Sequence, residues 1–240
     1  MALEDRVTID LGQPELNVNL YPSSPIRYKG SFQKLLSERK YKVNIAADMQ
    51  WFHKNVPCRV ACPVGTNARG YVTAIANGDY QYAYLVAREN NPFVSVCGKL
   101  CNAPCEPVCT RGKLDEPVAI RALKGFAVEK NRLSAREVYQ WLYNKIKGKV
   151  APPKKAETPR VAIVGAGPAG LSAAHDLVLM GYKVKLLEAS NQPGGMLTNA
   201  IPSFRLDREA VKKDIDGILS LGMELEVNVR CGKDFGVDEL

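Results

Sequence analysis

The sequence lacks any hydrophobic run long enough to cross a membrane. No stretch of its 240 residues approaches the roughly 20 apolar residues of a spanning helix. Residues 1–20 mix acidic and polar side chains and do not resemble a secretory signal. We therefore expect no membrane span and a cytoplasmic location. In such a reducing compartment, closely spaced cysteines are more often metal ligands or catalytic groups than disulfides.

The sequence also lacks a basic run and any motif typical of nucleic-acid binding. The formal net charge of +8 comes from the first 150 residues, which hold 22 lysines and arginines against 13 acidic residues. Ligating cysteines are deprotonated, so thiolates would offset this excess. No nucleophile paired with a base, and no pair of carboxylates, indicates substrate chemistry. We therefore expect no nucleic-acid partner and no catalytic side chain in this chain.

Cysteines are present and unevenly spread, since six of the seven fall into two groups. Four stand at intervals of four residues in "VCGKLCNAPCEPVC" (96–109), and two form "PCRVACP" (57–63). Proline directly after a ligating cysteine recurs in bacterial cluster motifs, whereas zinc sites usually pair CxxC units or include histidine. The pattern favours iron–sulfur over zinc, because helical residues four apart share a face and thiolates suit iron–sulfur iron. The candidate metal ligands are Cys58, Cys62, Cys97, Cys101, Cys105 and Cys109.

Composition and periodicity divide the chain into four parts. We predict an extended arm over 1–30, a helical domain over 31–147, a linker over 148–159 and an α/β domain over 160–240. In the helical domain the sequence predicts two helices in 69–90 broken near Gly78, with Asp79 as N-cap, and further helices over 115–132 and 134–148. Ser134 and Glu137 form a capping box. The fold class is therefore α+β multidomain, with an all-α domain before a partial Rossmann-like domain.

The α/β part contains a glycine-rich turn in a dinucleotide-binding context. Strands are predicted over 160–165, 182–188 and 223–229, and helices over 168–181 and 207–222. The turn follows the first strand and opens a helix, and Glu188 ends the second strand about 20 residues later. The first glycine makes the turn, the second admits a pyrophosphate and the third allows close helix packing. The turn residues are Gly165, Ala166, Gly167, Pro168, Ala169 and Gly170.

A second glycine pair follows in "QPGGML" (192–197), and then "IPSFRL" (201–206). Together with the turn and Glu188, these segments resemble the flavin-binding part of the glutamate synthase small-subunit family over residues 160–240. The resemblance implies FAD at this site, with Gly194, Gly195, Met196 and Arg205 among its binding residues. In that family NAD(P)H binds a second Rossmann domain, which is absent here. We therefore expect a fragment of a longer protein or completion by a partner chain.

Residues 50–130 resemble the helical module that this family shares with dihydropyrimidine dehydrogenase, which carries two [4Fe–4S] clusters. The family has two further cysteines, at positions that Gln50 and His53 occupy here, while Cys97 is an addition. Six cysteines complete one cluster, so a second would need a non-cysteine ligand such as His53, a partner's residue or a three-cysteine site. One relative uses a glutamine near the position of Lys124, which is itself a poor ligand.

These features predict an oxidoreductase subunit, an electron-transfer flavoprotein. It would pass electrons between NAD(P)H, FAD and [4Fe–4S] clusters to a partner oxidoreductase. The expected partners are other oxidoreductase subunits or a ferredoxin-like carrier, in a hetero-oligomer. One alternative is a true glutamate synthase small subunit. An alternative of another class is a zinc-stapled, non-catalytic scaffold subunit that binds a nucleotide.

Overall fold

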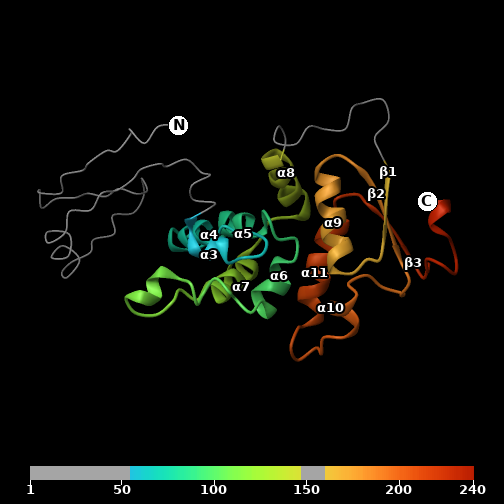
Figure 1. The fold of residues 1–240 in the computed structure, drawn as a ribbon. Coiled ribbons are helices and arrows are strands. Elements are labelled where there is room, and N and C mark those ends of the chain that lie inside the picture. Colours follow the sequence, from blue (N-terminus) through green and yellow to red (C-terminus); the bar gives the residue numbers. More distant parts are fainter. Residues whose placement is uncertain (1–54, 147–159) are drawn as a thin grey trace, which may run out of the picture. The chain divides into compact units, whose positions relative to one another are not determined.

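The computed structural model describes residues 55–146 and 160–240 (Figure 1). Residues Pro57–Leu240 form one compact unit. The predicted arm over 1–30, the linker over 148–159 and the positions Gln50 and His53 lie outside the described residues. The predicted domain boundaries therefore stay predictions. Among the described residues, no helix is long and apolar enough to cross a membrane.

The first described part, residues 55–146, contains helices and no strand. Its elements are α3 (Pro57–Val60), α4 (Ala68–Ala76), α5 (Tyr80–Arg88), α6 (Val94–Leu100), η1 (Thr110–Lys113), α7 (Ile120–Lys130) and α8 (Ala135–Ile146). The predicted break between α4 and α5 is present: Gly78 has φ +76°, and the Asp79 carboxylate accepts from Tyr82 N at 3.0 Å. The start of α8 also follows the predicted capping box, because Ser134 N donates to Glu137 Oε2 at 2.8 Å and Glu137 N donates to Ser134 Oγ at 3.3 Å.

The prediction of a helix beginning at residue 115 is wrong, because α7 begins at Ile120. Asp115 does not serve the first turn, since its carboxylate pairs with Arg111. The cap comes instead from a distant residue: Glu106 Oε1 accepts from Arg121 N at 2.9 Å. A side chain in the cysteine-bearing loop thus takes the place of the local acidic residues.

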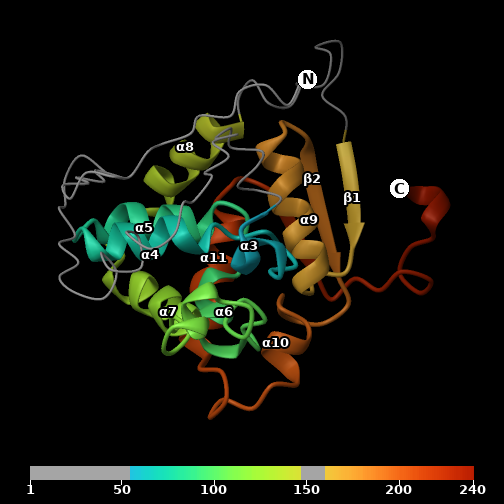
Figure 2. The same cartoon turned by 60° about the vertical axis from the view of Figure 1, so that its left-hand side comes forward.

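The second described part, residues 160–240, is a parallel α/β segment. Its elements are β1 (Arg160–Val164), α9 (Pro168–Leu179), β2 (Lys183–Glu188), α10 (Met196–Asn199), α11 (Arg208–Leu219), β3 (Glu224–Val227) and η2 (Val237–Glu239). The strands pair in the order β1-β2-β3, and Ile163 lies opposite Leu186, which lies opposite Leu225. Helix α9 lies alongside β1 and β2 (Figure 2). The third strand is shorter than the predicted 223–229.

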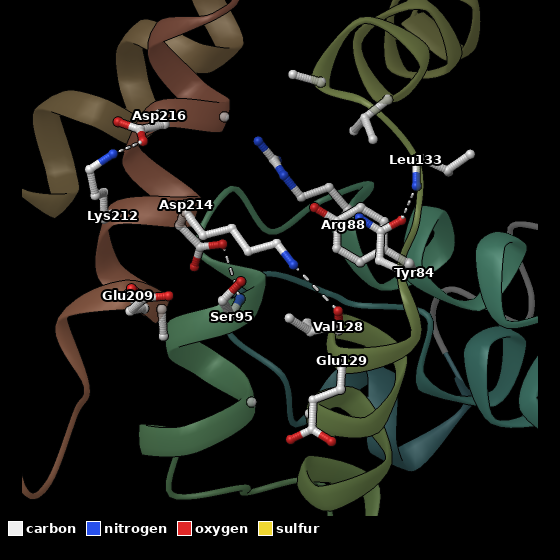
Figure 3. A pocket seen from close by; sticks show the side chains of 18 of the residues that line it. Tyr84, Arg88, Ser95, Val128, Glu129, Leu133, Glu209, Lys212, Asp214 and Asp216 are labelled. Carbon is white, nitrogen blue, oxygen red and sulfur yellow. Dashed lines mark hydrogen bonds and ion pairs between the residues drawn. The ribbon is translucent and has the colours of Figure 1, made fainter.

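A buried carboxylate on α11 caps helix α6. Asp214 Oδ1 accepts from Ser95 N at 3.1 Å (Figure 3). Asp214 Oδ2 accepts from Val96 N at 2.9 Å. The N-cap residue of α6, Phe93, makes no side-chain cap of its own, so Asp214 serves the otherwise orphan N–H groups. Burial raises the pKa of Asp214, and the hydrogen bonds from Val96 and Ser95 oppose that rise. Helix α6, which carries Cys97, is therefore tied to the α/β segment.

A second buried polar contact joins α5 to α9. Arg88 Nη1 lies 3.1 Å from His175 Nε2, and His175 Nδ1 lies 2.7 Å from Asp176 Oδ1. A guanidinium only donates, so Nε2 accepts and the proton of the neutral ring is on Nδ1. Burial lowers the pKa of His175, which agrees with a neutral ring.

Candidate functional site

The glycine-rich turn has the geometry that the sequence predicts for its third glycine. Gly165 has φ +99°, and its N–H donates to Leu187 O at 2.7 Å, which ties the turn to β2. A Cβ on Gly170 would lie 1.9 Å from Gly165 O. Gly167 is the N-cap of α9 and makes no side-chain cap, and Pro168 is in the first turn. Among the described residues, no side chain is seen to cap the first N–H groups of α9, which leaves them available to an anion.

The structure brings the second glycine pair against this turn. Gly194 N donates to Ala166 O at 2.8 Å, and a Cβ on Gly195 would lie 3.0 Å from Gly167 Cα. The glycine-rich turn lies at the carboxyl end of β1, and the second glycine pair follows the carboxyl end of β2. Ligands bind at this edge in parallel sheets. Met196 starts α10 with an exposed side chain. Arg205 is exposed in the segment before α11, and no hydrogen bond of its side chain to the glycine loops is seen in the described part of the chain.

Both carboxylate oxygens of Glu188 accept hydrogen bonds from the protein itself, which the sequence did not predict. Its Oε2 accepts from Ala166 N at 2.7 Å, and its Oε1 accepts from Ser190 N at 2.8 Å and from Ser190 Oγ at 2.7 Å. Burial raises its pKa, but these hydrogen bonds outweigh it and lower the pKa from the ordinary 4.5. Each carboxylate oxygen can accept more than one hydrogen bond. Its predicted role toward ribose hydroxyls therefore stays a prediction.

The Glu188 contacts predict a pH-dependent contribution to stability. A carboxylate whose pKa is lower in the folded than in the unfolded protein stabilises the fold at pH values above its unfolded pKa, which is near 4.5 for glutamate. This stabilisation is lost as the pH falls through the pKa of the folded state. We expect Glu188→Gln to lower the free energy of unfolding by about 1 kcal/mol at pH 7, and the difference from wild type to vanish at acidic pH. Urea unfolding at several pH values measures this. Glu224→Gln, an exposed position on β3, is the control, and an equal cost of Glu188→Gln at all pH values would contradict the interpretation.

The cysteine ladder does not lie on one helix. Cys97 is within α6, but α6 ends at Leu100 and Cys101 has ψ 134°. Ala103 then has φ +52°, so the chain turns away. The argument from helical spacing therefore holds for Cys97 and Cys101 alone, and the rest of the ladder lies in a loop. All seven cysteines are free thiols.

Electrostatic contacts show which thiols lie near one another. Burial raises the pKa of Cys58, and the nearby Cys109 adds to that rise. Cys101 likewise adds to the rise that burial causes for Cys97 and for Cys105, whose pKa reaches about 11. Cys101 thus acts on both Cys97 and Cys105, and Cys109 acts on Cys58.

The donor set fits an iron–sulfur cluster. Within the described ranges, no three side chains of Cys, His, Asp or Glu converge on one point as ligands of a single ion would. A four-iron cluster binds four thiolates around its periphery, so its ligands need not converge. The thiols are free and buried to differing degrees, and the buried lysine Lys124 acts electrostatically on three of them.

Two residues near the cysteines were not predicted from the sequence as parts of this site. Tyr71 is fully buried, and its hydroxyl donates to Ile120 O at 2.9 Å. Burial raises its pKa, and the nearby Cys105, Cys58 and Cys62 add to the rise. The sequence analysis considered Lys124 only because it lies near the position of a relative's glutamine ligand, for which a lysine is a poor replacement. No local signal marks either residue, because both meet the cysteines through helix packing.

One hollow among the described residues is lined by neither the predicted metal ligands nor the glycine loops. It has a volume of about 1080 Å³ and is bordered by side chains of α5, α6, α7, α8 and α11 (Figure 3). None of the predicted cysteine or glycine-loop residues lines it. Its walls carry charges of both signs, including the ion pair of Lys212 and Asp216.

Comparisons with known proteins define the class of both parts. Residues 38–135 match the family of dihydropyrimidine dehydrogenase domain II, 4Fe–4S cluster, and residues 163–211 match an NAD(P)-binding Rossmann-like domain. The chain therefore joins an iron–sulfur domain of the dihydropyrimidine dehydrogenase type to a Rossmann-like region. The predicted fold class and family resemblance are confirmed.

Three known proteins illustrate what this chain is similar to over most of its length. The chain is 39% identical over 194 residues to the NADP(+)-dependent formate dehydrogenase subunit beta of Moorella thermoacetica, covering 77% of this chain and 27% of that protein. It is 34% identical over 184 residues to the NAD-dependent dihydropyrimidine dehydrogenase subunit PreT homolog of Salmonella typhi, covering 76% and 41%. It is 29% identical over 222 residues to the NADH glutamate synthase of Schizosaccharomyces pombe, covering 90% and 10%. The chain thus spans from a tenth to about two fifths of these relatives.

Proposed function

We propose that this chain is the electron-transfer part of an NAD(P)H-dependent flavin and iron–sulfur oxidoreductase subunit. The observation that carries the proposal is the link between the two candidate cofactor sites. Asp214 of the Rossmann-like segment caps the helix that bears Cys97. Single-electron transfer needs cofactors held at a fixed separation, and a buried carboxylate shared between the two parts supports such positioning.

The chain's own residues would hold two cofactors, an iron–sulfur cluster and FAD. The cysteines of the two groups would bind one [4Fe–4S] cluster, and a second only with a further ligand. The glycine loops would receive the pyrophosphate of FAD at the start of α9, where the N-cap residue Gly167 makes no side-chain cap. When bound, the flavin accepts a hydride and the cluster carries single electrons, and the protein supplies binding, orientation and electrostatics.

FAD is proposed over NAD(P) for this site because the second loop belongs to the segments that resemble the flavin-binding part of the glutamate synthase small-subunit family. The family that matches residues 163–211 is described as NAD(P)-binding. The contact between Gly195 and Gly167, with the hydrogen bond from Gly194 to Ala166, adds a second backbone wall to the turn. Such a wall suits a dinucleotide, the class of ligand to which FAD belongs. NAD(P)H would then bind a domain outside these 240 residues.

The partners are proposed from the names of the similar proteins. Two relatives are named as subunits of larger oxidoreductases, which supports a hetero-oligomer. We propose other oxidoreductase subunits or a ferredoxin-like carrier as the electron partner, and a cytoplasmic location.

Metal and sulfide analysis tests the proposal against the zinc-stapled scaffold. Protein purified without oxygen is expected to contain about four iron and four acid-labile sulfide per chain, or about eight of each if a second cluster is present. It is also expected to bind FAD more tightly than NADP⁺. One zinc with no sulfide would overturn the electron-transfer function, and tighter binding of NADP⁺ would overturn the flavin assignment.

A further inference from the structure

Lys124 is a buried cation that faces the candidate cluster ligands. The residue lies in the middle of α7 and is 6% exposed. Its ammonium acts to lower the pKa of three thiols, those of Cys62, Cys97 and Cys105. These three cysteines are separated by up to 43 positions in the sequence, so the ammonium is near thiols of both cysteine groups.

A close helix crossing places Lys124 there. A Cβ on Gly98 would lie 3.0 Å from Gly125 Cα and 3.7 Å from the carbonyl carbon of Lys124. Two glycines therefore let α6 approach α7 almost backbone to backbone. Cys97 and Lys124 each immediately precede one of these glycines. The crossing thus fixes the lysine beside the thiol-bearing helix.

No acidic side chain in the described part of the chain neutralises this lysine. The ion pairs of the described residues do not include Lys124. The carboxylates that act on the same cysteines, Glu106 and Asp214, instead accept hydrogen bonds from the backbone at the starts of α7 and α6. A buried charge is costly unless an opposite charge compensates it. The thiols on which Lys124 acts supply such a charge when they are deprotonated as metal ligands.

We propose that Lys124 is the fixed counter-charge of the iron–sulfur centre and raises its reduction potential. The inference rests on the proposed function, because it presumes a cluster on these cysteines. The net charge around a cluster is one of the factors that set its potential. A buried ammonium stabilises the state with the extra electron more than the oxidised state, and burial leaves this interaction little screened by salt. In this role Lys124 acts on the cluster electrostatically and does not ligate it.

The test is a potentiometric titration of the anaerobically purified protein, followed by electron paramagnetic resonance of the reduced cluster. Lys124→Met keeps the length of the side chain and removes the charge. We expect its midpoint potential to become more negative by at least about 59 mV, which corresponds to a tenfold change in the equilibrium constant of a one-electron reduction. Lys124→Arg keeps the charge and is expected to stay near wild type. Lys130→Met removes an exposed charge from the same helix and is expected to leave the potential unchanged.

Iron and sulfide contents separate the failures. Wild-type protein without iron or sulfide would overturn the proposed function itself. Full iron in Lys124→Met with an unchanged potential would overturn the counter-charge role alone. If the Met variant loses its iron while the Arg variant keeps it, the charge is required for the bound cluster and the inference stands. Loss of iron from both variants would assign Lys124 a packing role and overturn the inference.

Discussion

Gly170→Ala is expected to lower the free energy of unfolding by about 3 kcal/mol, at the upper end for overpacking a well-packed site. The added methyl group would lie 1.9 Å from the carbonyl oxygen of Gly165 and 3.3 Å from Ile163 Cγ2. A backbone oxygen cannot swing away as a flexible side chain does, so α9 would have to move off β1. The turn would then lose the helix start that the dinucleotide needs. Urea unfolding and flavin binding by equilibrium titration measure both effects.

Gly217→Ala is the matched control for this prediction. Gly217 is also a helical glycine, in α11, and a Cβ there meets nothing within 4 Å. Alanine is the better helix former, so we expect this variant to be more stable by up to about 1 kcal/mol. Equal losses for the two variants, or unchanged flavin binding in Gly170→Ala, would contradict the close-packing role of Gly170.

Cys105→Ser is expected to remove the iron–sulfur centre. Cys105 is the most buried of the six candidate ligands, and an alcohol is a much poorer ligand than a thiolate for iron–sulfur iron. We expect the loss of about four iron and four sulfide per chain, with the visible absorption of the cluster. Anaerobic purification followed by iron and sulfide assays is the measurement.

The seventh cysteine provides the control for this substitution. Cys231 lies outside both cysteine groups, in an isolated bridge with Phe235. Cys231→Ser is expected to retain wild-type iron and sulfide. Loss of iron from Cys231→Ser, or full iron in Cys105→Ser, would overturn the assignment of the ligands.

Local features of the chain were predictable because their causes lie within a few residues. The capping box of Ser134 and Glu137 spans one helical turn, and the break at Gly78 follows from its left-handed backbone. The turn that contains Gly165 and Gly170 is likewise defined by glycines five positions apart. Such spacing suffices for the strand–turn–helix order and for the dinucleotide-binding prediction.

The interactions that complete the sites are long-range, and no sequence pattern contains them. Asp214 caps α6 across more than 110 positions, and Glu106 accepts a hydrogen bond at the start of α7, which the sequence had predicted to begin at residue 115. Lys124 looks like an ordinary helical lysine until α6 and α7 cross at two glycines and its side chain is buried beside the helix that carries Cys97. The sequence by itself determined which residue types form the two candidate sites. Only the tertiary structure decided their charge environment, because burial and long-range hydrogen bonds depend on which elements pack together.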